Sequence, residues 1–252
     1  MIELEQRGPL TILHMVRGKG NSLDISFLRA LTEALSQIER SDSRAVVLTG
    51  QGTIFGAGVD LPALAAGGPQ YVREFIPVMT HGFESLVKFP KPLVAAVNGH
   101  AIAGGAIIMM ACDVKLLARG RARIGLTEVL VGVQFPAWAL EIARFTTPAH
   151  HFQEMILTGR TWQPEDALAR GMVDELVDAE RLLERACEVA GELAAIHPAT
   201  YAATKSAVRR PMIEAAQRQT LAEGASVIER WCSPEVMATV GAYVARTIKR
   251  DG

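Results

Sequence analysis

The first half of the chain alternates between short apolar runs and longer stretches in which apolar residues recur at helical spacing. Five runs predict strands because they are rich in apolar residues and bounded by turn residues: 2–5, 10–15, 45–49, 93–97 and 114–118. The first two flank Arg7-Gly8-Pro9, which is typical of a hairpin. Helices are predicted over 24–40, where Asp24 is a suitable N-cap, and over 70–88. The order is a repeated strand–strand–helix rhythm rather than a simple βαβ alternation.

From about residue 147 onward, the pattern becomes almost entirely helical. Helices are predicted over 148–157, 164–170, 179–196, 198–208, 211–229 and 234–249. Prolines stand at or near the start of several of them, where a missing N–H costs little. We therefore expect an α/β core over 1–195 followed by a helical C-terminal region over 196–252.

The composition fits a globular protein with a substantial core. The chain has 252 residues, of which 49% are hydrophobic and 21% charged, and its formal net charge is −1. This charge gives no electrostatic reason to expect nucleic acid or an anionic membrane surface as a partner. The apolar run 101–112 is too short to span a bilayer, and the N-terminus lacks a signal-peptide pattern. Three widely spaced cysteines suggest reduced thiols, so we expect a cytoplasmic protein.

Residues 98–113, N-G-H-A-I-A-G-G-A-I-I-M-M-A-C-D, raise the question of chemistry. Gly104 and Gly105 open an uncharged helix, although glycine disfavours a helix interior by about 1 kcal/mol relative to alanine. One explanation is close packing of the helix against a strand. The other is a ligand, because the first N–H groups of a helix have no partner within it and attract negative charge.

A second glycine-rich segment follows the strand 45–49. It fits neither the dinucleotide fingerprint, since Phe55 stands at the third glycine position, nor a phosphate-binding loop, which needs Gly-Lys-Ser/Thr. An N–H from the loop 56–60 would complete a two-donor oxyanion hole with the helix start. Each such donor contributes about 3–4 kcal/mol when a thioester or ester oxygen becomes an oxyanion.

Six stretches of the chain resemble, in order and spacing, motifs of the crotonase superfamily of enoyl-CoA hydratases and isomerases. They are 44–50, 55–61, 91–106, 111–118, 124–133 and 158–177. The resemblance implies an α/β fold, a spiral of ββα units with a helical C-terminal trimerisation region. It also implies an acyl-CoA thioester as substrate without a metal or redox cofactor, and a homotrimer or dimer of trimers.

The resemblance also assigns roles to individual residues. The backbone N–H groups of Val59 and Gly104 are expected to form the oxyanion hole, although Ala103 replaces the first glycine of the family's three-glycine run. The residues expected to contact the substrate are Ser22, Ala57, Asp60, Leu61, Ile107, Phe135 and Trp138.

A difference from the hydratases favours one reaction. Hydratases carry two catalytic glutamates, whereas this chain has Ile107 at the first position and Glu128 at the second. One carboxylate suffices to move a proton from C2 to C4, so the resemblance predicts isomerisation of Δ3- to trans-Δ2-enoyl-CoA. Gly132, Pro136 and Trp138 also stand at isomerase-like positions. The alternatives are a hydratase-like or other single-glutamate enzyme and a non-catalytic acyl-CoA-binding protein.

Several other polar residues are given lesser roles. His100 is expected to pack or to form a hydrogen bond, and His150 and His151 lack the spacing of a metal site. Glu74 or Glu141 would restore a second acid/base if either entered the pocket. Four cations are candidates for contact with the CoA phosphates or for a merely solvated face: Lys205, Arg209, Arg210 and Lys249.

Overall fold

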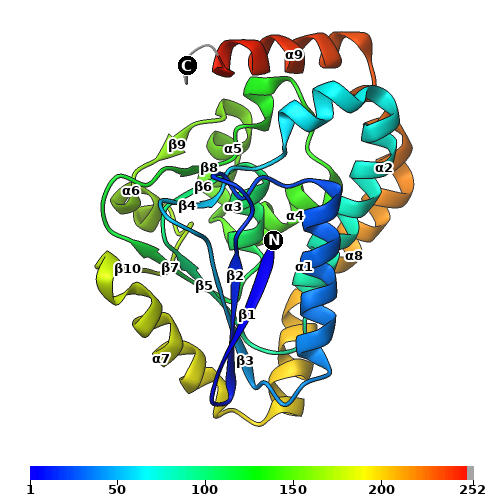
Figure 1. The fold of residues 1–252 in the computed structure, drawn as a ribbon. Helices are drawn as coiled ribbons and strands as arrows, with labels where there is room; N and C mark the ends of the chain where they lie inside the picture. The colour runs from blue at the N-terminus through cyan, green and yellow to red at the C-terminus, as the bar shows by residue number, and fades with distance from the viewer. Residues whose placement is uncertain (249–252) are drawn as a thin grey trace.

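The computed structural model describes residues 1–248, which form two β-sheets surrounded by helices (Figure 1). The larger sheet has the order β1-β2-β3-β5-β7-β10 and the smaller one the order β4-β6-β8-β9. The strands are β1 (Ile2–Arg7), β2 (Leu10–Met15), β3 (Ala45–Thr49), β4 (Ile54–Gly56), β5 (Leu93–Val97), β6 (His100–Ile102), β7 (Val114–Ala118), β8 (Ile124–Gly125), β9 (Thr161–Trp162) and β10 (Glu175–Val177).

Successive turns of the chain add one strand to each sheet. β3 and β4, then β5 and β6, then β7 and β8 follow this pattern, and the pairs β3–β5, β5–β7, β4–β6 and β6–β8 are all parallel. The predicted spiral of ββα units is therefore confirmed. Strands β3, β5 and β7 occupy the predicted residues, because nearly continuous apolar runs are the signature of parallel strands buried on both faces.

Helices cover both faces of the larger sheet. They are α1 (Ile25–Glu39), α2 (Leu61–Lys88), α3 (Gly104–Met110), α4 (Ala137–Thr146), α5 (Ala149–Thr158), α6 (Pro164–Ala169), α7 (Leu182–Ala194), α8 (Pro198–Trp231) and α9 (Pro234–Ile248), with 3₁₀ turns η1 (Glu128–Val131) and η2 (Ala179–Arg181). Figure 1 shows α7 along one face of the sheet and α1 and α2 on the other. The core on the α7 side is a small separate cluster, whereas the larger cluster joins the other face to α3, α4 and α8.

Two helices differ from the prediction near the site. α2 starts at Leu61 rather than at residue 70, because Asp60 caps it and Pro62 occupies its first turn; the predicted start falls just after a kink at Gly68, where φ is 60°. α4 was not predicted. It brings Trp138 and Ile142 into the core.

The predicted break between 208 and 211 is wrong, since α8 continues through Pro211. Two buried cations fix this stretch to the rest of the protein. The Lys205 ammonium donates to Asp113 at 2.6 Å and to the Lys91 carbonyl at 2.9 Å. The Arg209 guanidinium donates to Asp113 at 2.7 Å and to the Val87 and Ala111 carbonyls at 2.9 Å. These tertiary bonds outweigh the local preference of proline against a helix interior.

The same bonds correct another expectation. Lys205 and Arg209 are buried and committed to Asp113, so they are not available to CoA phosphates. Arg210 is exposed, and Lys249 lies outside the described residues. The division expected at 195/196 coincides with the turn between α7 and α8, but α8 packs on α4 within the larger core, and the division stays a prediction.

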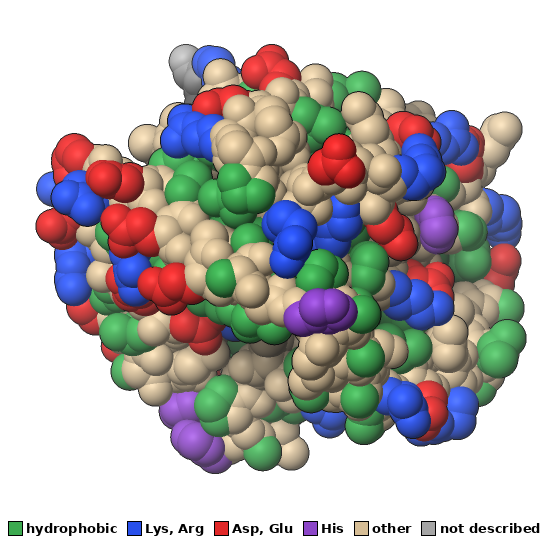
Figure 2. Space-filling model, turned by 90° about the horizontal axis from the view of Figure 1, so that it is seen from below, with side chains coloured by type: hydrophobic (Ala, Val, Ile, Leu, Met, Phe, Trp, Pro, Cys, Tyr) green, Lys and Arg blue, Asp and Glu red, His purple; other side chains and the backbone are tan. Residues whose placement is uncertain are grey.

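The described surface has mixed charge. Acidic and basic side chains are interspersed over the face seen in Figure 2, as a formal net charge of −1 leads one to expect. Every helix within residues 1–248 is too short or too polar to cross a membrane.

Replacing Asp113 by asparagine tests the network that fixes α8. The change leaves two buried cations without a counter-charge, so the free energy of unfolding is expected to fall by about 3–5 kcal/mol. Urea unfolding measures the loss. Asp166→Asn is the matched control, because Asp166 pairs with Arg170 on an exposed helix and its loss is expected to cost less than about 1 kcal/mol. A loss as small for Asp113→Asn as for the control would contradict the proposed role of the network.

Candidate active site

A cavity of about 510 Å³ lies at one end of the smaller sheet, beneath α9. Its lining brings together six residues predicted to form the site: Ser22, Ala57, Val59, Asp60, Leu61 and Glu128. They come from three separate regions of the sequence, namely the β2–α1 loop, the segment from β4 to the start of α2, and η1. Ile102 and Ala103, which precede α3, form another part of the wall, so the helix start reaches the same cavity.

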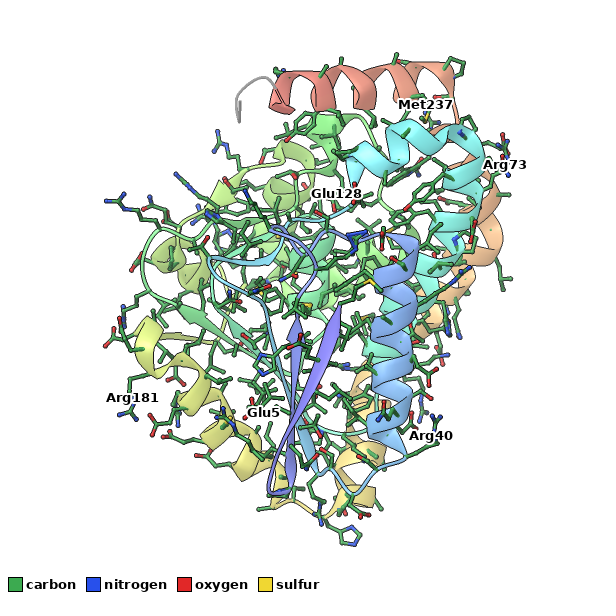
Figure 3. All side chains as sticks on the ribbon, viewed as in Figure 1. Glu5, Arg40, Arg73, Glu128, Arg181 and Met237 are labelled. Carbon is green, nitrogen blue, oxygen red and sulfur yellow. The ribbon has the colours of Figure 1, made fainter. Side chains whose placement is uncertain are left out.

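Glu128 is the buried acid of this cavity. It begins η1, lies below α9 in Figure 3, and is only 8% exposed. Its Oε2 atom has no hydrogen-bond partner among the described residues. Burial raises the pKa of Glu128 from its usual value near 4.5 to about 8, against a smaller opposing effect of the backbone N–H groups of Glu128 and Thr127. A carboxyl group in this state is suited to accepting and returning a proton near neutral pH.

The two predicted oxyanion donors lie on neighbouring segments. Leu23 pairs with the 58–60 segment through Leu23 N–H to the Gly58 carbonyl and Asp60 N–H to the Leu23 carbonyl, at 2.7 and 2.9 Å. In such a parallel bridge, the N–H of the intervening residue, Val59, points away from Leu23. Gly104 is the first residue of α3, so its N–H has no acceptor within the helix. Within residues 1–248 neither N–H has an assigned acceptor, which leaves both for a ligand oxygen.

The glycine pair at the helix start permits close packing against the β4 segment and the loop that follows it. A Cβ at Gly105 would lie 2.2 Å from the Gly56 carbonyl oxygen, so only glycine permits this contact between backbones. A Cβ at Gly58, where φ is 85°, would lie 2.8 Å from Ala103 Cβ and 3.4 Å from Gly104 N. The first explanation suggested by the sequence, close packing, is therefore confirmed, and this packing brings the two loops into contact; a ligand at the helix start stays a prediction.

The second carboxylate of the lining, Asp60, is already engaged. Its side chain caps α2 by accepting a hydrogen bond from Ala63 N–H at 3.0 Å, and it lies 3.8 Å from the Arg17 guanidinium. The two other carboxylates that the sequence suggested as a second acid/base group lie outside the cavity. Glu74 pairs with Arg29 on the surface, and Glu141 is buried against Arg144 and Gln219. Among the described acidic residues, Glu128 and Asp60 are those that line the cavity.

Three predicted contact residues lie outside this lining. Ile107 is fully buried in α3, and Trp138 is 2% exposed in the core beneath Lys88. Phe135 borders a separate small cavity of about 70 Å³. His100 forms a hydrogen bond, as expected, since its Nδ1 accepts from Arg123 N–H at 3.0 Å. The described residues contain no group of three His, Cys, Asp or Glu side chains arranged to hold a metal ion.

Sequence reasoning missed the contribution of the last two helices. Trp231 at the end of α8 and Tyr243 and Val244 on α9 complete the wall of the cavity. Trp231 is held there because its indole N–H donates to the Gln134 carbonyl at 2.8 Å. The apolar periodicity of α9 predicted a helix, but no local signal indicates that it folds back over Glu128 of the same chain.

The raised pKa of Glu128 predicts how stability depends on pH. The folded state keeps this proton up to about pH 8, whereas the unfolded chain releases it near pH 4.5. Between these values the folded state binds more protons, so stability falls as pH rises. Glu128→Gln removes the effect. At pH 9 we expect the melting temperature of Glu128→Gln to exceed that of the parent by several degrees, since each kcal/mol in the free energy of unfolding shifts it by about 2–4 °C. At pH 5 we expect the two melting temperatures to be similar. Calorimetry at both pH values tests this, and a difference independent of pH would contradict it.

Comparisons with known proteins agree with the geometry. The sequence matches the Enoyl-CoA hydratase/isomerase family over residues 7–244. (E)-benzylidenesuccinyl-CoA hydratase from Thauera aromatica is 33% identical over 193 residues, covering 74% of this chain and 73% of that protein. The mitochondrial Delta(3,5)-Delta(2,4)-dienoyl-CoA isomerase of Pongo abelii is 31% identical over 201 residues, covering 74% of this chain and 61% of that protein.

One solved structure extends the likeness to the whole fold. Human mitochondrial delta3-delta2-enoyl-CoA isomerase matches 100% of this chain and 99% of its own, with a TM-score of 0.95 at 24% identity. The likeness includes the helical C-terminal region. Hydratase and isomerase names thus both occur among the relatives, and the family resemblance seen in the sequence is confirmed. The chain therefore belongs to the enoyl-CoA hydratase/isomerase family of acyl-CoA enzymes, the crotonase superfamily.

Proposed function

We propose that the protein is an enoyl-CoA isomerase that converts Δ3-enoyl-CoA to trans-Δ2-enoyl-CoA, with Glu128 as the acid/base group. The observation that carries the proposal is the pair of carboxylates at the cavity. Glu128 has an unbonded, buried oxygen, whereas Asp60 is occupied by its helix cap and by Arg17. Moving a double bond by one position needs one group that takes a proton and returns it, and a single free carboxylate fits that need.

In the proposed mechanism the thioester oxygen lies between the N–H groups of Val59 and Gly104. Glu128 removes a proton from C2, and the electron pair of the C2–H bond forms a C1=C2 bond while the π pair of the thioester carbonyl moves to its oxygen. The resulting dienolate keeps the C3=C4 bond, and its negative charge is stabilised on the thioester oxygen by the two donors. The protonated Glu128 then delivers the proton to C4: the C3=C4 pair forms the C4–H bond, the C1=C2 pair becomes C2=C3, the thioester carbonyl re-forms, and the Glu128 carboxylate is regenerated.

The raised pKa of Glu128 suits the removal of the proton from C2. A carboxylate with a pKa of about 8 is a stronger base than an exposed glutamate, and so is better matched to an activated C2–H. The apolar lining around it includes Ile102, Val131 and Val133, and the position of the first hydratase glutamate is filled by Ile107. These residues leave no second carboxylate at that position to activate a water.

Hydration is the second candidate because one observation favours it. Asp60 does line the same cavity, and a relative with 33% identity is named a hydratase. If Asp60 left its cap during turnover, two carboxylates would face the substrate. The coenzyme A thioester as substrate without a further cofactor, the homotrimer or dimer of trimers, and the cytoplasmic location remain expectations from the family resemblance.

A paired assay separates the candidates. Purified protein is supplied with 3-hexenoyl-CoA and, separately, with crotonyl-CoA. Isomerisation of the first with little hydration of the second is expected, and Glu128→Gln is expected to lower kcat about 10²–10⁴-fold. Glu141→Gln is the matched control, because it changes a buried glutamate that lies outside the cavity. Rapid hydration that depends on Asp60 would replace the isomerase proposal by the hydratase one, and binding of acyl-CoA without turnover would favour a binding protein.

The pH dependence of the reaction is a separate test. Because the free enzyme must hold Glu128 as the carboxylate, kcat/KM is expected to rise about tenfold per pH unit below a pKa of about 8 and to level off above it. Initial rates from pH 6 to 10, compared with those of the Glu141→Gln control, measure this profile. A flat profile down to pH 6 would contradict the raised pKa of the base, and the loss of activity in Glu128→Gln would then decide whether Glu128 is that base.

A further inference from the structure

Arg17 forms ion pairs with carboxylates on the two segments that carry Leu23 and Val59. The guanidinium Nη2 contacts the carboxylate of Asp24 and lies 3.8 Å from that of Asp60. Asp24 is the N-cap of α1, where it accepts from Phe27 N–H at 2.7 Å, and Asp60 is the N-cap of α2. One side chain from the β2–α1 loop therefore joins the first residues of two helices that are distant in sequence.

The two carboxylates lie directly after the pairing that orients the Val59 donor, on the same side of it. Asp24 follows Leu23 and Asp60 follows Val59, and Leu23 and Val59 are the partners of the isolated parallel bridge. A cation fixed between these two carboxylates holds the paired segments together at their ends. The planar guanidinium suits this task because its donors point in fixed directions, whereas a lysine ammonium has no such fork.

The loop that carries Arg17 is itself fixed. The Arg17 N–H donates to the Asn21 side chain at 2.7 Å, and Asn21 N–H returns a hydrogen bond to the Arg17 carbonyl at 3.0 Å. The Asn21 amide also reaches the Phe55 carbonyl in β4 at 3.4 Å. The loop is thus tied to the strand that leads into the glycine segment, so the position of Arg17 and that of the donor are set by the same contacts.

Charge gives a second reason for a cation here. Asp60 is adjacent in sequence to the N–H that receives the developing negative charge, and its side chain is 21% exposed. An uncompensated carboxylate at this place would oppose the formation of an enolate by repulsion in a partly desolvated site. Arg17, whose side chain is 25% exposed, offsets part of this charge, since it is shared with Asp24.

We propose that Arg17 is a positioning residue for the oxyanion hole: by bridging Asp24 and Asp60 it fixes the Leu23–Val59 pairing, orients the Val59 N–H and offsets part of the charge of Asp60. The inference rests on the proposed function, because it assigns the Val59 N–H to the thioester oxygen. It predicts that the loss of Arg17 weakens the binding of an enolate-like charge more than the binding of the acyl-CoA itself.

The test compares two ligands on four forms of the full-length protein. A saturated acyl-CoA probes ground-state binding, and an acyl-CoA bearing a nitronate at the α-carbon probes a negatively charged enolate mimic. The forms are the parent, Arg17→Met, Arg17→Lys and Arg29→Met. Arg29 is the matched control because it also links α1 to α2, through Glu74 at 2.9 Å, but on the exposed surface. Calorimetric titration gives the ratio of the two dissociation constants, and assays with 3-hexenoyl-CoA give kcat and KM.

We expect Arg17→Met to reduce the preference for the nitronate about 10–100-fold and to lower kcat by a similar factor, with KM changed less than about threefold. The preference of Arg17→Lys for the nitronate should lie between those of the parent and Arg17→Met, since lysine keeps the charge but loses the planar set of donors. Arg29→Met should match the parent. If Arg17→Met does not fold, the ratio of the two dissociation constants measured for Arg17→Lys tests the proposal.

Three results would overturn the proposal. An unchanged preference in a less stable Arg17 variant would mean a structural role alone. Both ligands could instead bind more weakly to the Arg17 variant by the same factor. If this difference from the parent disappeared for ligands without the 3′-phosphate of CoA, Arg17 would contact that phosphate instead. A parent protein that shows no preference for the nitronate would refute the oxyanion hole itself and the role of Arg17 with it.

Discussion

The contact between the backbones of Gly56 and Gly105 is the constraint on which the site depends. A single methyl group at either position would enter the space of the other segment, at 2.2 Å from a carbonyl oxygen in one direction and 2.9 Å from a Cα atom in the other. Because the β4 loop and the start of α3 touch in this way, the N–H of Val59 and that of Gly104 lie on adjoining segments. The spiral fold makes the contact possible, since it adds β4 and β6 to the smaller sheet as parallel neighbours.

The protein treats its buried charges in two opposite ways. Asp113 is surrounded by donors: Lys205, Arg209 and the Leu93 N–H all bond to it. Glu128 is also buried, at 8% exposed, but one of its oxygens has no partner among the described residues. The first arrangement anchors a long helix, and the second leaves a carboxyl group unpaired at a cost in stability, a pattern that is common for catalytic groups and that fits the proposed role of Glu128. Burial alone does not distinguish the two carboxylates, but the number of donors around each does.

Much of the fold could be predicted from the sequence because local signals and tertiary environment agree there. The strands at 45–49, 93–97 and 114–118 are apolar throughout or nearly so, and the structure buries almost every residue of each. Pro211 misled the prediction because bonds from Lys205 and Arg209 to residues about a hundred positions away cannot be read locally. At the site, the residues on the turns after β4 and β8 were identified, whereas Phe135 and Trp138 were assigned to a wall that Trp231 and Tyr243 occupy.

The position of α9 has a consequence for the order in which the site is made. During synthesis the donor segments and Glu128 leave the ribosome more than a hundred residues before α9, which carries Tyr243 and Val244 at residues 243 and 244. The cavity beside Glu128 therefore lacks part of its wall until the last helix has been made and has docked. The candidate site is in this sense the last part of the fold to be completed during synthesis.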